Sequence, residues 1–168
     1  MTATEQFFDW LEHTDFSLWL RGESLLVFPL ILTLHTICMG LIAGTSWAID
    51  FRILGLARQV PLSAMEKFYP LLWVALATNF ITGTLLFISY PYKAFTNPVF
   101  YLKLSFIAVA VFLVVKIRSE VLLNAHPNWK RAKYLAGASI ASWAAAITAG
   151  RLLAYTFIWL RVGIPGGF

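Results

Sequence analysis

Four long apolar stretches dominate this sequence and limit what the chain can fold into. They cover residues 24–47, 70–90, 100–115 and 134–159. A helix needs about 20 apolar residues to cross the hydrocarbon core of a bilayer. The third stretch is the shortest, and it reaches a full span only if Lys103, Lys116 and Arg118 extend their charged ends toward the interfaces. The pattern predicts an all-α integral membrane protein with four spans.

Composition supports a lipid environment. The chain is 60% hydrophobic and only 12% charged, whereas soluble domains carry about 25% charged residues. A net charge of +5 could indicate nucleic-acid binding in a soluble protein. Here the basic residues flank the apolar stretches, so membrane topology explains them better. We therefore expect the lipid bilayer as the main partner and no nucleic acid.

The distribution of Lys and Arg predicts the orientation. The loops after the first and third stretches share a basic set: Arg52, Arg58, Lys67, Lys116, Arg118, Lys130, Arg131 and Lys133. The opposite side carries fewer: Arg21, Lys93, Lys103 and Arg161. Basic loops face the cytoplasm, so both termini are expected outside, in a bacterial inner (plasma) membrane.

Two regions follow from this pattern. Residues 1–23 place acidic and aromatic side chains on different faces of a helix, which predicts an interfacial amphipathic segment on the outer surface. Residues 24–168 form the transmembrane domain. Because the loops between its apolar stretches are short, an up-down-up-down four-helix bundle is the expected arrangement.

Three polar side chains fall within the apolar stretches: His35, Asn79 and Arg151. Their depths allow them to meet in the outer half of the bundle. A guanidinium at the depth of Arg151 costs about 3 kcal/mol by insertion scales, and no acidic residue is expected inside an apolar stretch. We therefore expect Arg151 to face inward and to be paired, with Tyr155 one turn further on as a hydrogen-bond neighbour. Lys103 is expected to extend to the outer interface instead.

His35 has several interpretations. It is either a buried structural histidine, an axial ligand of haem b or a hydrogen-bond partner of a quinone. Haem would also give Arg151 and Lys103 a role beside its propionates, but no apolar stretch offers a second histidine. His35, Cys38 and Met39 share one helical face and could bind copper, although further ligands would have to come from elsewhere.

Motifs of soluble enzymes are missing. There is no phosphate-binding loop, no H-E-x-x-H, no G-x-S-x-G and no pair of intramembrane carboxylates. Stand-alone catalytic activity is not expected.

Three runs resemble a family of uncharacterised bacterial four-span inner-membrane proteins. They are Phe28-Pro29-Leu30 with His35 and the following Asp50-Phe51-Arg52-Ile53-Leu54-Gly55-Leu56, then Asn97-Pro98-Val99-Phe100-Tyr101-Leu102-Lys103-Leu104, and Ala149-Gly150-Arg151-Leu152-Leu153-Ala154-Tyr155. The resemblance implies that His35, Asp50, Arg52, Lys103 and Arg151 belong to one shared design, with Asp50 and Arg52 at the cytoplasmic interface. It implies no particular activity.

A fainter similarity links the chain to copper-resistance-D-like and b-type-cytochrome-like bundles. Such bundles imply a second histidine toward the end of the third span, where this chain has Lys116-Ile117-Arg118. The leading hypothesis is a redox-associated membrane subunit that binds haem or quinone near His35, Asn79, Lys103, Arg151 and Tyr155. The alternatives are a non-catalytic scaffold or assembly protein, in a homo-oligomer or a larger membrane complex, and a copper or small-molecule transporter.

Overall fold

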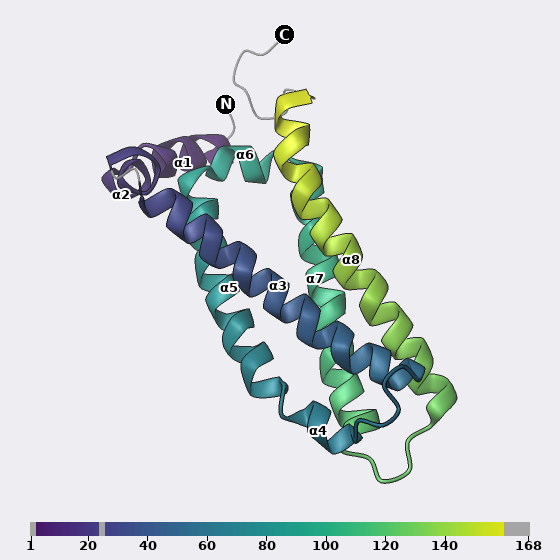
Figure 1. Ribbon diagram of the computed structural model, residues 1–168. Coiled ribbons are helices and arrows are strands. Elements are labelled where there is room, and N and C mark those ends of the chain that lie inside the picture. Colours follow the sequence, from purple (N-terminus) through teal and green to yellow (C-terminus); the bar gives the residue numbers. More distant parts are fainter. Residues whose placement is uncertain (1–2, 24–25, 160–168) are drawn as a thin grey trace.

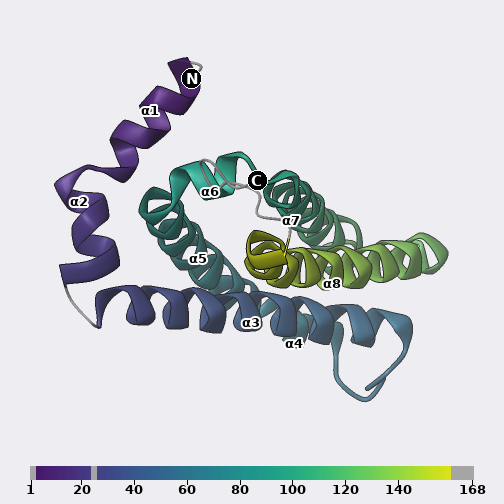
Figure 2. The ribbon, with the colours of Figure 1, turned by 90° about the horizontal axis from the view of Figure 1, so that it is seen from above.

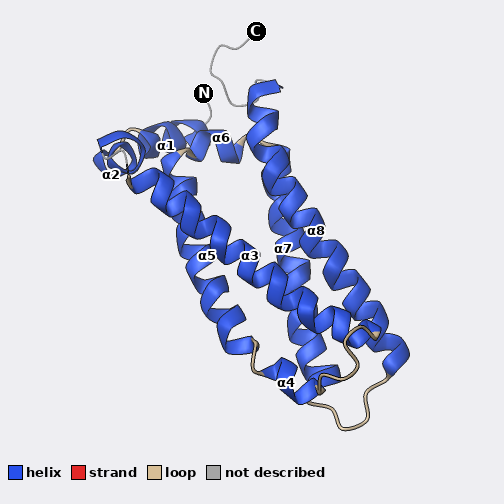
Figure 3. Cartoon of the chain, viewed as in Figure 1, coloured by secondary structure: helices blue, strands red, loops and turns tan. Residues whose placement is uncertain are grey.

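A computed structural model describes residues 3–23 and 26–159, and every regular element among them is helical (Figure 3). Four helices are long: α3 (Val27–Leu54), α5 (Tyr69–Ser89), α7 (Pro98–Ile117) and α8 (Trp129–Trp159). The short elements are α1 (Ala3–Glu12), α2 (Asp15–Leu18), α4 (Leu62–Glu66), α6 (Pro91–Phe95) and two π-helical turns, η1 (Trp19–Glu23) and η2 (Arg118–Leu122). Residues 160–168, which include Arg161, lie outside the described residues.

Three helical segments are long and apolar enough to cross a membrane: Val27–Leu54, Leu62–Ser89 and Pro98–Leu122. In their most apolar parts only 17% to 22% of the residues are buried inside the protein, so most of the apolar side chains face outward, as lipid contact requires. This confirms a multi-pass membrane protein. The fourth predicted span, α8, is long but is not among these segments, because Ala, Ser and Gly dilute its apolar character and Arg151 interrupts it.

Helix ends follow local sequence signals. Gly55 has φ +107°, a left-handed conformation that closes α3 and suits glycine. Asn97 caps α7 by accepting a 3.0 Å hydrogen bond from the Val99 amide, and Pro98 follows in the first turn. Because the chain stays helical up to Gly55, α3 ends seven residues beyond the predicted end of the first span.

The four long helices run along one another, with α3 antiparallel to α8 (Figures 1 and 2). Helix α3 packs against both α5 and α8, and α7 packs against α8. Helices α5 and α7 touch at two places. The Tyr69 hydroxyl donates to the Val114 carbonyl oxygen at 3.1 Å, and the Phe87 and Phe100 rings stack with centroids 5.6 Å apart.

The hydrophobic core lies mainly where α3, α5, α7 and α8 approach α4. Small residues let α8 approach its neighbours closely: Ala132, Ala136, Ser139, Ala146 and Ala149 are all buried. At this end, which we call the α4 end, α4 and η2 close the structure.

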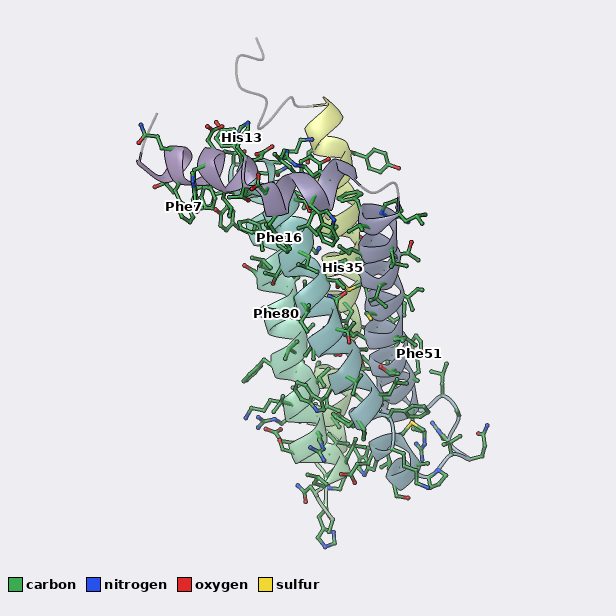
Figure 4. All side chains as sticks on the ribbon, turned by 90° about the vertical axis from the view of Figure 1, so that its left-hand side faces the viewer. Phe7, His13, Phe16, His35, Phe51 and Phe80 are labelled. Carbon is green, nitrogen blue, oxygen red and sulfur yellow. The ribbon has the colours of Figure 1, made fainter. Side chains whose placement is uncertain are left out.

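The opposite end, which we call the α6 end, carries α1, α2 and α6 (Figure 1). Helices α1 and α2 lie across the long helices rather than along them (Figure 4). Ser17 donates a 3.0 Å hydrogen bond to the Ile88 carbonyl, and the Phe8 and Phe95 rings lie 4.4 Å apart. Several large apolar side chains remain exposed there: Phe7, Trp10, Phe16, Leu18 and Trp19.

Candidate functional site

His35 lies in the half of α3 nearer the α6 end and faces α5 (Figure 4). Its Nδ1 is 3.0 Å from Thr82 Oγ1. The Thr82 hydroxyl itself donates to the carbonyl oxygens of Thr78 and Asn79, at 2.9 and 3.1 Å. Because that hydroxyl proton is engaged, Thr82 accepts from His35, and Nδ1 carries the hydrogen. Within the described chain His35 Nε2 makes no hydrogen bond.

Gly83 makes room for the imidazole. A Cβ atom at this position would lie 3.1 Å from His35 Cε1 and 3.6 Å from Nδ1. Such an approach is tighter than ordinary van der Waals contact, so a side chain here would force the ring to move. The ring is therefore held from two directions, by the Thr82 hydrogen bond and by the bare backbone at Gly83.

Lys103 of α7 lies on the other side of the same region. A Cβ at Gly150 of α8 would lie 3.6 Å from Lys103 Cε and 3.9 Å from Nζ. Asn97 Nδ2 donates to Thr156 Oγ1 at 2.9 Å, so six residues further along each antiparallel helix Lys103 comes level with Gly150. The expectation that Lys103 extends to the outer interface is wrong. Its stem lies across α8, and its charge is close enough to act on His35.

Asn79 completes the group from α5. Its side chain is 7% exposed, and Oδ1 has no hydrogen-bond partner among the described residues. The Asn79 carbonyl is also a polar neighbour of the His35 ring. His35, Asn79 and Lys103 therefore lie in one region, whereas depth predicted a group of His35, Asn79 and Arg151. We call these three residues, with Thr82 and Gly83, the His35 site.

Arg151 and Tyr155 do not join the His35 site. Both side chains are exposed, Tyr155 to 54%, and Arg151 makes no hydrogen bond or ion pair in the described part of the chain. The expectation of an inward-facing, paired Arg151 is wrong. Gly150 occupies the face of α8 that meets Lys103, and one residue turns a helix by about 100°. Arg151 therefore points away, which also keeps two positive charges apart.

Residues that could complete a metal site are dispersed. His13 lies in the turn between α1 and α2, with its Nδ1 2.7 Å from the Asp9 carbonyl oxygen (Figure 4), and His126 lies in the exposed loop before α8. Cys38 is buried and unbonded to another cysteine. Among the described residues no three His, Cys, Asp or Glu side chains gather as a metal would need. In the described part of the chain, neither of the other two histidines lies on a long helix beside His35.

Asp50 is a buried polar residue that the sequence reasoning misplaced. It was expected at the membrane interface, but its side chain is 1% exposed, inside α3 and between α5 and α8. Helix α3 extends past the predicted apolar stretch and so includes this carboxylate. The missed signal was Gly55, since a glycine five residues later marks the helix end and places Asp50 more than one turn inside it.

Comparison with protein-family models, with curated protein sequences and with solved structures finds no match to this chain. The function must therefore be argued from the site itself.

Proposed function

We propose that this protein is a membrane subunit that binds a quinone-type redox carrier at the His35 site. The observation that carries the proposal is the fixed imidazole: Nδ1 lies 3.0 Å from Thr82 Oγ1, and the ring is half-buried. Because the Thr82 hydroxyl donates to its own helix, we assign the hydrogen to Nδ1, which leaves Nε2 as an acceptor. A quinol hydroxyl is the kind of donor that such a nitrogen accepts.

The neighbours of His35 suit both oxidation states of such a ligand. The Lys103 ammonium can donate to a quinone carbonyl oxygen, and Asn79 Oδ1 is a second free acceptor for a quinol hydroxyl. The outward-facing apolar side chains of α3 and α5 give a hydrophobic ligand direct access from the lipid. Small-molecule sites are usually lined by apolar side chains together with a few polar groups.

Haem b is the second candidate, on a specific observation. A metal-bound histidine usually donates its other ring N–H to a protein oxygen, which fixes the ring, and His35 does so to Thr82. His35 would supply one axial ligand, and Lys103 could meet a propionate. Among the described residues no second histidine lies on a long helix, which favours the quinone.

The proposed topology has four spans. Helix α8 crosses with the other three because its small-residue face is covered by α3 and α7 rather than by lipid. The exposed aromatic side chains of α1 and α2 lie in the outer interface, and the basic loops at the α4 end face the cytoplasm. Arg151 then reaches from α8 toward lipid headgroups or a partner subunit.

The binding experiment compares three forms of the protein purified in mild detergent. Wild type should retain quinone extractable with organic solvent, and His35→Ala should lose it, with affinity for added ubiquinone falling about tenfold or more, as expected when a hydrogen bond worth about 1.5 kcal/mol is lost. Thr36→Ala is the matched control, because Thr36 is exposed and bonds only its own helix, to the Leu32 carbonyl.

The same preparations separate the alternatives. If an oxidised-minus-reduced visible spectrum contains haem bands that vanish in His35→Ala, the ligand at the His35 site is haem and not a quinone. If all three forms are colourless and bind ubiquinone equally weakly, the His35 site only locks the helices together, and the scaffold or assembly role stands. Flux of copper or another solute into vesicles, without quinone binding, would favour the transporter.

A further inference from the structure

A second group of polar atoms is buried between α3 and α8, toward the α4 end. It consists of the Asp50 carboxylate, the Ser46 and Ser139 hydroxyls and the Trp143 indole N–H. All four side chains are at most 2% exposed. Five polar atoms of these side chains have no hydrogen-bond partner in the described chain: both Asp50 carboxylate oxygens, both serine Oγ atoms and the Trp143 indole nitrogen. We call this group the Asp50 cluster.

The helix register brings the four side chains together. Ser46 precedes Asp50 by one turn on the same face of α3, and Trp143 follows Ser139 by one turn on the same face of α8. Ser139 is a polar neighbour of the Asp50 carboxylate. Because α3 and α8 are antiparallel (Figure 1), Ser46 then comes level with Trp143. The Asp50 cluster thus spans two turns of the interface.

The charged and titratable groups that face this carboxylate are few. On α5, the titratable group near the Asp50 carboxylate is Tyr69, whose hydroxyl donates a hydrogen bond to the Val114 carbonyl oxygen. Arg118 of η2 lies over the Tyr69 ring at 5.2 Å, but its guanidinium is paired with Glu66 of α4 at 3.2 Å. On α3 itself, Arg52 turns away to donate to the Val60 carbonyl. Ser139 and Trp143 of α8 carry no charge.

We infer that the Asp50 carboxyl is a proton-binding site and that it is occupied by a proton at neutral pH. A buried carboxylate without a cation beside it is strongly disfavoured, and a protein avoids it by keeping the group neutral. The protonated acid gains an O–H that can donate to a serine oxygen, while its carbonyl oxygen can accept from the other hydroxyl or from the indole N–H.

A metal cation fits the Asp50 cluster less well than a proton does. Hard cations take six or more oxygen ligands, and this region offers one carboxylate and two hydroxyls, with the helical carbonyl oxygens already bonded in the backbone. The Trp143 N–H can only donate, so it suits a carboxyl oxygen and not a cation.

The proton on Asp50 affects how α3 packs against α8. Loss of the proton would place an uncompensated charge in their interface, so release of the proton requires these helices to separate or a cation to enter. The Asp50 cluster is also independent of the His35 site, since fifteen residues of α3, about 22 Å, lie between them.

Infrared spectroscopy of the full-length protein in lipid at pH 7 tests the inference. We expect a C=O stretching band of a protonated carboxylic acid that shifts in D₂O and is missing from Asp50→Asn. Glu120→Gln is the matched control, because Glu120 is part-exposed and paired with Lys116 and Arg131, and its loss should leave the band unchanged.

Ser139→Ala provides a second assignment that does not depend on how well Asp50→Asn folds. It should move the frequency of the band without removing it, because it changes the hydrogen bonding of a group that stays protonated. Identical spectra for wild type and Asp50→Asn, both folded by circular dichroism, would overturn the inference. A band that appears only after sodium is removed would also overturn it and assign a cation site instead.

Discussion

Single residues decide which polar groups of this protein can reach a ligand. The His35 ring is fixed because its Nδ1 forms a hydrogen bond with Thr82 Oγ1 and because Gly83 leaves space for the ring. Neighbouring positions on α8 have opposite roles, with Gly150 inside against Lys103 and Arg151 outside. Such assignments depend on the rotation of a helix about its axis. They are invisible when residues are sorted by depth alone.

Gly83→Ala tests the fit at the His35 site. The added methyl group would lie 3.1 Å from His35 Cε1, so we expect the ring to be displaced and ubiquinone affinity to fall severalfold, although alanine favours a helix by up to about 1 kcal/mol over glycine. Gly137→Ala is the control, since nothing lies within 4 Å of its new methyl group. Equal affinity in both variants, measured by ligand titration, would show that Gly83 does not shape the site.

At the scale of elements, the sequence predicted which helices form better than it predicted where each helix begins and ends. Helix α5 (Tyr69–Ser89) matches the predicted residues 70–90 closely, because Pro70 and Tyr90 mark both ends. The first span was predicted too short, because hydropathy falls at Asp50 while the helical hydrogen bonds continue to Gly55. Asp50 was therefore placed at an interface when it lies in the core.

Asn97 joins two elements, and its loss should weaken both. It caps α7 through the Val99 amide and donates to Thr156 of α8, and it is 1% exposed. We expect Asn97→Ala to lower the free energy of unfolding by about 2 kcal/mol, from a lost cap of about 1 kcal/mol and one buried hydrogen bond. The measurement is denaturation in mixed detergent micelles.

Asn124→Ala is the matched control for this experiment. Asn124 accepts a hydrogen bond from the His126 amide in an exposed loop, so its removal should cost less than about 0.5 kcal/mol. If the two variants are equally stable, the Asn97 link does not hold α7 to α8.

At the scale of the whole molecule, composition was enough to predict an all-helical multi-pass membrane protein. Which helices touch could not be predicted, because the apolar stretches are interchangeable in hydropathy. The close packing of α8 depends on small residues, of which Ala136, Ala146 and Ala149 are buried. Depth placed His35 and Asn79 at a similar level, but it did not predict the inward position of Lys103 or the exposure of Arg151 and Tyr155.

The proposed orientation is testable with single cysteines in a Cys38→Ala background. Cys38 is buried, so its replacement should be tolerated. Cysteines at Gln59 and Ala125 should react with a membrane-impermeant maleimide only in broken cells. A cysteine at Gln6 and a C-terminal tag should be accessible in spheroplasts. A tag found on the cytoplasmic side would show that α8 does not cross the membrane.

The central claim is that His35 offers a free Nε2 to a redox carrier. Solid-state nitrogen NMR of the histidine-labelled protein in lipid measures this most directly, with His35→Ala assigning the signals. The account predicts that His35 carries its hydrogen on Nδ1 and that the Nε2 resonance shifts when the reduced quinone is added. A hydrogen on Nε2, or an Nε2 resonance that saturating quinol leaves unchanged, would contradict it.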